Sequence, residues 1–260
     1  MKFLTRVLKI VFLVSLALYA GLFFRKPALP SPDNVLDAVR EQEPRQEPAA
    51  LDPITVPIEE FTYTLTPRYR YELTGLVVSL YDADNWLDFT HKNDPGNIKD
   101  ICVAWGENIA SGAYRTTKFW SGEFTCSWRW RAGEPPVVNA AASNSHLIPA
   151  NVEIARRIKE IAIGDQIRMM GYLADYRVES AEGKTLYTRS TSTTRDDAGN
   201  GACEIVYVTD VEILTKGSRA ATRARRYAFW SMTGSFVSLV VLGMALPLTL
   251  VKPRRKDFIA

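Results

Sequence analysis

The sequence predicts a mainly β protein in which one small domain lies between two transmembrane helices. Three features of the 260-residue chain support this fold class. Apolar and polar residues alternate with the period of a β-strand in several stretches of residues 61–214. Residues 151–162 instead repeat their apolar residues with the period of a helix. An uncharged apolar run lies near each end of the chain, as in a membrane span.

The two apolar runs are interpreted as membrane spans. Residues 10–24 are 15 uncharged residues, which snorkelling by Arg6 and Lys9 extends towards a full span within residues 1–26. Residues 227–251 are about 25 uncharged residues and can cross with some tilt. A cleaved signal peptide is the alternative for the first run, because its start is basic and small residues lie near its end. The apolar run continues past that position, so two spans are expected.

The second span carries a stripe of small residues that would let another helix approach closely. The stripe consists of Ser231, Gly234, Ser235 and Ser238. Its partner is either the first span or a helix of another membrane protein.

Charge is distributed unevenly along the chain. Residues 27–215 carry 18 Lys and Arg residues against 28 Asp and Glu residues. This acidic centre argues against binding to a phosphate backbone, so nucleic acid is not an expected partner. A basic helix at 215–226 and a basic tail at 252–260 are instead suited to membrane lipids.

The orientation in the membrane does not follow from charge, because seven basic residues flank the spans on each side. The first segment has the form of a signal anchor, and long domains are translocated largely regardless of charge. Both termini are therefore expected in the cytoplasm. The central domain would then be extracytoplasmic, on the periplasmic side of the cell (inner) membrane of a bacterial envelope.

A disordered linker is predicted between the first span and the domain. Residues 27–60 are rich in proline and acidic residues, with seven prolines and no aromatic residue up to position 57. Such a composition is typical of an extended segment that cannot form a core.

Three strands are expected at the start of the domain. The first runs through residues 69–78, where Gly75 indicates a bulge or a sharp bend. The second covers residues 100–105 and the third residues 118–131. Residues 133–146 are predicted to be a loop.

A helix and two strands complete the domain. Asn151 is suited to cap the helix, and Gly164 follows it where a residue with positive φ is favoured. Residues 166–174 then alternate as a fourth strand, and residues 203–214 as a fifth. The connection between them, residues 179–202, is too long for an ordinary turn and is expected to contain a hairpin arm at positions 188–194.

This order resembles the oligonucleotide/oligosaccharide-binding (OB) fold, a five-stranded small barrel with one helix between strands three and four. The resemblance covers residues 61–214 and is one of pattern. It implies a binding face on strands two and three, flanked by the loops 82–99 and 179–202. The ligand-binding residues expected on these loops are Trp86, His91, Arg189, Arg195, Asp197 and Asn200. Ordinary surface charge is the alternative explanation of these polar loops.

A disulfide between Cys126 and Cys203 is implied by the same resemblance. The third and fifth strands of an OB barrel are neighbours, and strand periodicity points both cysteines inward. The bridge would contribute up to about 4 kcal/mol in the chain-entropy model. A Cys102–Cys126 pair is disfavoured, because Cys102 alternates away from the apolar residues of its strand. Three buried free thiols are the alternative.

No catalytic residue, cofactor or metal site is expected. A thiol hydrolase needs a cysteine beside a histidine, and His91 and His146 both fall in predicted loops. A zinc site needs paired ligands at short spacing, which the sequence lacks. A loop beginning at Asp196 is similar to a calcium loop only superficially, because Ala198 and Tyr207 stand where carboxylates belong.

Together these features favour a membrane-anchored extracytoplasmic protein that acts in binding or assembly, as an accessory or scaffold component of a cell-envelope complex. Its partners would be other membrane or envelope proteins, besides membrane lipids. Receptor-like capture of a small or oligosaccharide ligand is the alternative, and an enzyme of unnamed type is the third. A cavity with convergent polar groups would favour capture or catalysis, whereas an exposed apolar patch would favour assembly.

Overall fold

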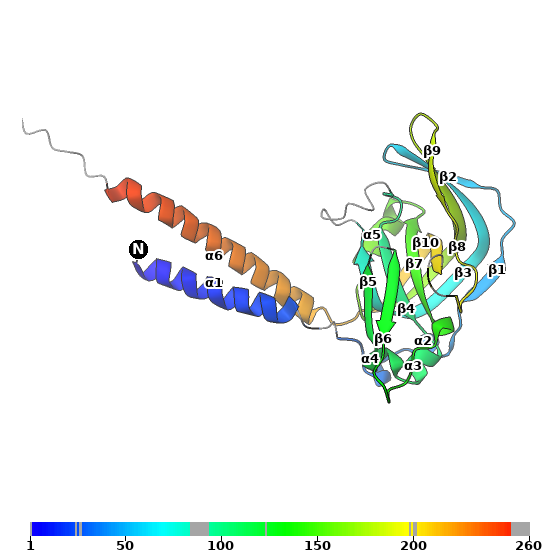
Figure 1. Cartoon of the computed structure of the whole chain (residues 1–260), viewed down its shortest axis with the longest axis horizontal. Helices are drawn as coiled ribbons and strands as arrows, with labels where there is room; N and C mark the ends of the chain where they lie inside the picture. The colour runs from blue at the N-terminus through cyan, green and yellow to red at the C-terminus, as the bar shows by residue number, and fades with distance from the viewer. Residues whose placement is uncertain are drawn as a thin grey trace, which may run out of the picture. The chain divides into compact units, whose positions relative to one another are not determined.

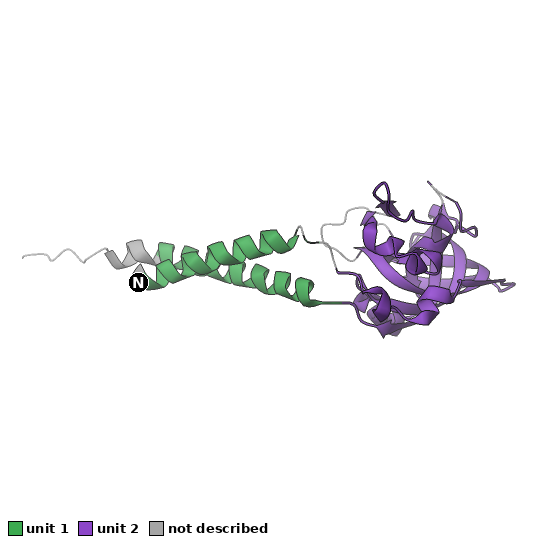
Figure 2. Ribbon diagram, turned by 90° about the horizontal axis from the view of Figure 1, so that it is seen from below, with its two compact units in different colours: residues 1–27, 218–260 green, residues 28–217 purple. Residues whose placement is uncertain are grey.

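The chain forms two compact units, one made by residues 1–27 and 218–260 and the other by residues 28–217 (Figures 1 and 2). Each unit is described on its own. The computed structural model describes residues 2–23, 25, 28–83, 94–122, 124–197, 199 and 202–250.

The first unit is a pair of helices. Both α1 (Lys2–Phe23) and α6 (Ala220–Leu250) are long and apolar enough to cross a membrane. They lie side by side (Figure 2), with the rings of Phe12 and Phe236 6.0 Å apart. The predicted basic helix at 215–226 is not a separate element, because α6 continues through its last seven residues into the apolar run.

Part of the predicted small-residue stripe is used between these two helices. Ser15 Oγ of α1 donates a hydrogen bond to Ser231 Oγ of α6 at 3.0 Å. Ser235 is buried, whereas Gly234 and Ser238 are exposed. A partner for Ser231 is therefore found within the chain.

The second unit is built on five central strands. They are β3 (Phe61–Asp82), β4 (Lys99–Ala104), β7 (Ala142–Pro149), β8 (Gln166–Glu179) and β10 (Cys203–Thr215). Each pairs with two of the others: β3 with β4 and β8, β7 with β4 and β10, and β8 with β10. The β7–β10 pairing is parallel and the rest are antiparallel. The domain is therefore mainly β sheet, as predicted.

The long strand β3 serves two sides of this sheet. Its residues 62–76 pair with β8, and its residues 76–82 pair with β4. Gly75 lies at the change of partner, where a Cβ atom would collide with Val103 Cγ1. A register shift follows directly, between Val77 and Ser79. The irregularity predicted at Gly75 therefore lies slightly further along the strand, and Gly75 itself is the point of closest packing between neighbouring strands.

Helix α5 (Val152–Glu160) closes the main core. Asn151 Oδ1 accepts a hydrogen bond from Ile154 N at 3.0 Å, which is the predicted cap. Ile158 is fully buried among the apolar side chains of the sheet, and Gly164 has a φ of 88°. The predicted helix followed by a strand is confirmed.

The predicted linker is partly ordered, which corrects the domain boundary from residue 61 to residue 28. Val35 and Val39 are buried in a second apolar cluster. The Gln166 side chain accepts from Leu36 N at 2.7 Å and donates to Asn34 O at 2.7 Å. These buried side chains and hydrogen bonds order the segment in spite of its polar composition. The elements of the segment are η1 (Pro32–Asn34), α2 (Asp37–Glu41), β1 (Arg45–Pro48) and β2 (Ile54–Ile58), and both strands pair with β3.

The third strand was predicted in the wrong place. Residues 118–131 form a hairpin of β5 (Lys118–Gly122) and β6 (Thr125–Arg129), which is a separate two-stranded sheet. The turn includes Phe124 with a φ of 55°. The third strand of the main sheet is β7. It follows η3 (Asn139–Ala141), begins within the residues predicted to be a loop and extends beyond them. The polar side chains of β7 are buried, so its sequence lacks the alternation that marks a strand.

Short elements occupy the remaining connections. In the long connection before β10, β9 (Thr185–Arg189) pairs with β8, so the predicted hairpin arm exists but begins and ends earlier. Between β4 and β5 lie two single-turn helices, α3 (Glu107–Ala110) and α4 (Ala113–Thr116).

Candidate functional site

A cavity of about 650 Å³ lies where β6, β7 and the first residues of β10 meet Arg195, Asp197, Gly199 and Ala202. Its size is within the range of small-molecule sites in proteins. Phe124 and Trp128 contribute aromatic surface to its lining. Its polar lining includes side chains of β7 and β10, so the main sheet forms one wall and the β5–β6 hairpin forms another.

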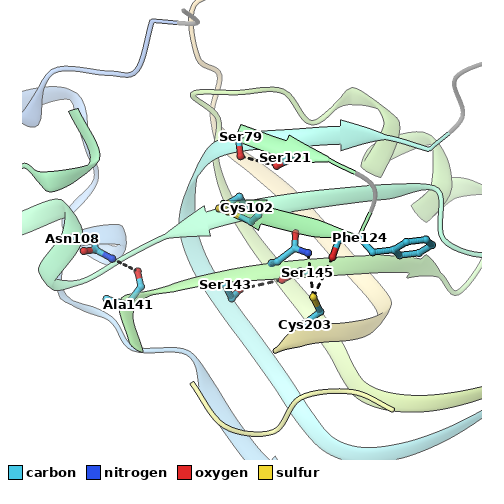
Figure 3. Close-up of a disulfide and its surroundings, with 11 residues drawn as sticks. Ser79, Cys102, Asn108, Ser121, Phe124, Ala141, Ser143, Ser145 and Cys203 are labelled. Atoms are coloured by element: carbon cyan, nitrogen blue, oxygen red, sulfur yellow. Dashed lines mark hydrogen bonds between the residues drawn. A yellow bond between two sulfur atoms is a disulfide. The ribbon is translucent and has the colours of Figure 1, made fainter. Parts of the chain in front are cut away.

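A disulfide between Cys102 of β4 and Cys126 of β6 attaches the hairpin to the main sheet (Figure 3). Their Cα atoms are 5.7 Å apart. The predicted Cys126–Cys203 disulfide is therefore wrong, and Cys203 is a free thiol. Cys102 does alternate away from the main core. The hairpin covers this outer face, however, and buries Cys102 there in the second apolar cluster.

The free thiol of Cys203 lies in the cavity wall beside two polar partners. Asn144 Nδ2 donates a hydrogen bond to Cys203 Sγ at 3.4 Å, and Cys203 Sγ donates to Phe124 O at 3.3 Å (Figure 3). The imidazole of His146 lines the same cavity, two residues along β7 from Asn144, which is the strand partner of Cys203. Cys203 is therefore held in one orientation, at the edge of a space large enough for a ligand.

A buried carboxylate holds the other side of the imidazole. His146 Nδ1 lies 2.6 Å from Asp100 Oδ1, and Asp100 is fully buried. The Asp100 carboxylate also accepts from Asn97 Nδ2 at 2.8 Å and from Phe124 N at 3.0 Å. These bonds fix the carboxylate and, through it, the imidazole ring.

The electrostatics of this group favour charge separation. Burial alone would lower the pKa of His146, but its hydrogen bonds to Asp100 and Cys203 and their negative charges raise it to about 9. Burial opposes ionisation of the Cys203 thiol, but the hydrogen bond and charge of His146 and the hydrogen bond from Asn144 lower its pKa overall. Both shifts favour a thiolate beside an imidazolium, which is the reactive form of cysteine.

Two polar atoms of the cavity wall lack a hydrogen-bond partner among the described residues. They are Asn144 Oδ1 and Glu204 Oε2, on side chains that are each only 6% exposed. Burial raises the pKa of Glu204 to about 8, so its carboxyl group takes up a proton more readily than usual. Buried polar groups are normally satisfied, and unsatisfied ones in a cavity call for an explanation.

The residues predicted to bind a ligand are only partly brought together. Arg195 and Asp197 line the cavity, as predicted for residues of the long connection. Arg189 does not line it: its guanidinium lies 3.9 Å from the centre of the Phe124 ring and 3.8 Å from Asp94. The predicted residues Trp86, His91 and Asn200 lie outside the described residues.

The group of Asp100, His146 and Cys203 was not predicted from the sequence. The reason is that His146 lies in β7, which was predicted to be a loop. Asp100, His146 and Cys203 are far apart in the chain, and only the pairing of three strands joins them. The sequence holds a weak indication of strand β7, because Asn144 and His146 alternate with Ser143, Ser145 and Leu147.

No protein-family model, no curated protein and no solved structure matches this chain. Within the described residues, no group of three or more His, Cys, Asp or Glu side chains is arranged to hold a metal ion. The cavity and its residues are therefore the basis for the proposed function.

Proposed function

We propose that residues 28–217 form an OB-like five-stranded barrel with added β-strands and a covering hairpin. The support is the pairing of five strands, each with two of the others, and the parallel pairing of the third with the fifth. Helix α5 lies between the third and fourth of these strands, as in the OB pattern. The cavity then belongs to the wall of the barrel that carries β4 and β7.

The protein is a two-span protein of the cell (inner) membrane, with this domain on the extracytoplasmic side. The two apolar helices and the acidic domain between them support two crossings. A disulfide supports an oxidising compartment, because cytosolic thiols are generally kept reduced.

Thiol counting tests this location. In native membranes denatured without reductant, we expect one cysteine, Cys203, to react with a maleimide, because the other two form a disulfide. All three should react after reduction. Three labelled cysteines without reductant would mean that the domain lies in a reducing compartment and would contradict the proposal.

The function is capture of a small ligand in the cavity beside Cys203. The observation that carries this proposal is a pair of buried atoms, Asn144 Oδ1 and Glu204 Oε2, that have no hydrogen-bond partner among the described residues and lie in the wall of a 650 Å³ space. A ligand that forms a hydrogen bond with each atom would remove the energetic cost of leaving it unpaired, typically about 1–3 kcal/mol. Capture therefore explains why these two polar atoms lack partners among the described residues.

A variant with a filled cavity tests capture. Ser127 lines the cavity and Thr188 is an exposed residue of β9, so Ser127→Trp should fill the space and Thr188→Trp should not. The full chain in detergent is equilibrated with small molecules extracted from cell envelopes, gel-filtered and examined by mass spectrometry. We expect the wild type and Thr188→Trp to retain compounds that Ser127→Trp loses. Retention of the same compounds by all three proteins, or of none by the wild type, would contradict capture.

Assembly with other membrane or envelope proteins is the second candidate. It is favoured by Trp120 in the β5–β6 hairpin and Trp130 directly after it, which are 41% and 43% exposed. Exposed tryptophans are enriched at protein interfaces. In-situ cross-linking that depends on both tryptophans would support assembly, and it is compatible with ligand capture at the neighbouring cavity.

A further inference from the structure

Three neighbouring strands of the main sheet place a carboxylate, an imidazole and a thiol on one face of the sheet, beside the cavity. We propose that Cys203 is a nucleophile for acyl transfer, with His146 as its proton acceptor and Asp100 as the residue that orients the imidazole. This rests on the proposed function, because the acyl substrate would be the small ligand of the same cavity. It goes further in assigning a reaction to the site.

The strand register explains why the three side chains meet. His146 of β7 is the direct partner of Asp100 of β4. Cys203 of β10 is the partner of Asn144, two residues before His146 on the same strand. Residues two apart share a face of a sheet, so all four side chains project from one face. That face is the one that the β5–β6 hairpin covers and that the cavity borders.

Each member of the group has the surroundings that its role needs. Asp100 engages His146 Nδ1, which leaves Nε2 as the ring nitrogen available to the thiol. His146 is 5% exposed and so is shielded from bulk water, whereas Cys203 is only partly buried and borders the cavity. A nucleophile beside a base, with the base held by a third group, is the general arrangement of covalent catalysis.

The reaction proceeds in two balanced steps. The Cys203 thiolate attacks the carbonyl carbon of the substrate, forming a C–S bond while the carbonyl π electrons move to oxygen. The intermediate collapses to a thioester, and the leaving group takes the proton of the His146 imidazolium. Water then attacks the thioester, giving its proton to neutral His146, and Cys203 departs as a thiolate. The net change is an ester or thioester plus water giving an acid plus an alcohol or thiol.

Asn144 is placed to stabilise the tetrahedral intermediate. Its Nδ2 atom lies 3.4 Å from Cys203 Sγ, so it is next to the position where the substrate oxygen becomes negative. Preorganised donors of this kind contribute much of the rate of acyl transfer.

The cavity favours a small ester or thioester whose acyl group is uncharged. Phe124 and Trp128 offer aromatic surface to an acyl chain. Asp197 would repel a carboxylate, and the nearby Arg195 is already engaged by Glu43, at 3.6 Å. A space of about 650 Å³ is suited to a small molecule.

The experiment uses the full chain in detergent with para-nitrophenyl butyrate as the probe. We expect release of nitrophenolate and a transient butyryl group on the Cys203 peptide, detected by mass spectrometry after acid quenching. Cys203→Ala should abolish both signals, and His146→Asn should slow thioester formation by about 100-fold. Glu212→Gln, an exposed residue of the same strand, should behave as the wild type. Circular dichroism checks that each variant is folded.

A measurement on the unmodified protein keeps the test independent of variant folding. Iodoacetamide should alkylate native Cys203 at a lower pH than it alkylates a free cysteine. The proposal is overturned if the wild type gains no butyryl group or if another residue carries it. It is also overturned if Cys203 is found in a disulfide with Cys126 and not as a thioester. If the wild type still retains cavity ligands in these cases, capture stands and the nucleophile alone is rejected.

Discussion

Replacing Asp100 by asparagine is expected to lower the free energy of unfolding by about 3 kcal/mol, the order of effect seen when one partner of a buried ion pair is removed. Asp100 is fully buried, and its carboxylate accepts hydrogen bonds from His146 Nδ1, Asn97 Nδ2 and Phe124 N. An asparagine has a single acceptor oxygen, so at least one of these donors would face its amide group. Urea unfolding of the full chain in detergent, followed by the tertiary circular dichroism of the β domain, measures the loss.

The loss of unfolding free energy in Asp100→Asn should depend on pH in a defined direction. The pKa of His146 is raised from 6.5 to about 9 in the folded protein, with Asp100 as the main favourable cause. A raised pKa stabilises the fold fully below pH 6.5, and this stabilisation is lost as the pH rises through about 9. The difference between wild type and Asp100→Asn should therefore be largest below pH 6.5 and smaller above pH 9. The pH at which iodoacetamide alkylates Cys203 should also rise in the variant, because His146 is less readily protonated.

The matched control is Asp210→Asn. Asp210 forms an ion pair with Arg157 at 3.0 Å, but both side chains are largely exposed. Exposed ion pairs contribute little, so a loss below about 1 kcal/mol with unchanged alkylation of Cys203 is expected. Equal losses in the two variants, or a pH-independent loss in Asp100→Asn, would show that the His146–Asp100 contact does not hold a proton in the folded protein.

Removing the disulfide should be comparably destabilising. In Cys102→Ala/Cys126→Ala, a loop across 24 positions of sequence is no longer closed, which costs about 3.5 kcal/mol in the chain-entropy model. The β5–β6 hairpin is a separate sheet and would lose its covalent attachment to β4. Alkylation of Cys203 should become faster, because this hairpin forms one wall of the cavity.

Reductant supplies an internal control for this prediction. It should lower the unfolding midpoint of the wild type to that of the double variant and leave the double variant unchanged. A double variant as stable as the oxidised wild type would show that the hairpin is held by its apolar and hydrogen-bonded contacts alone, such as the bond between Ser79 and Ser121 (Figure 3).

Features that depend on nearby residues were predictable from the sequence. The cap at Asn151, the burial of Ile158 and the positive φ at Gly164 all follow from spacing within about a dozen residues. The special role of Gly75 was also predictable, because a glycine within a strand usually marks a bulge or a close approach, and the structure shows a close approach there. The two apolar helices followed from composition alone.

Features that depend on distant partners were not predictable in the same way. Residues 28–60 have the composition of a linker, yet Val35 and Val39 find apolar partners and Gln166 holds the chain at Leu36. Strand β7 buries serine, asparagine and histidine side chains, and the hydrogen-bond partners of Asn144 and His146 come from other strands. Without those partners in view, its sequence is typical of a loop.

The disulfide and the candidate site show the same division. Strand alternation correctly placed Cys102 on the face opposite the main core, but it could not reveal that a hairpin covers that face and supplies Cys126. Asp100, His146 and Cys203 meet because strands distant in sequence pair in a particular register. Periodicity specifies which face of an element is apolar, whereas pairing and register arise from the packing of the whole chain. The sequence thus accounts for the three longest helices and for four of the five central strands, and the site exists only in the folded sheet.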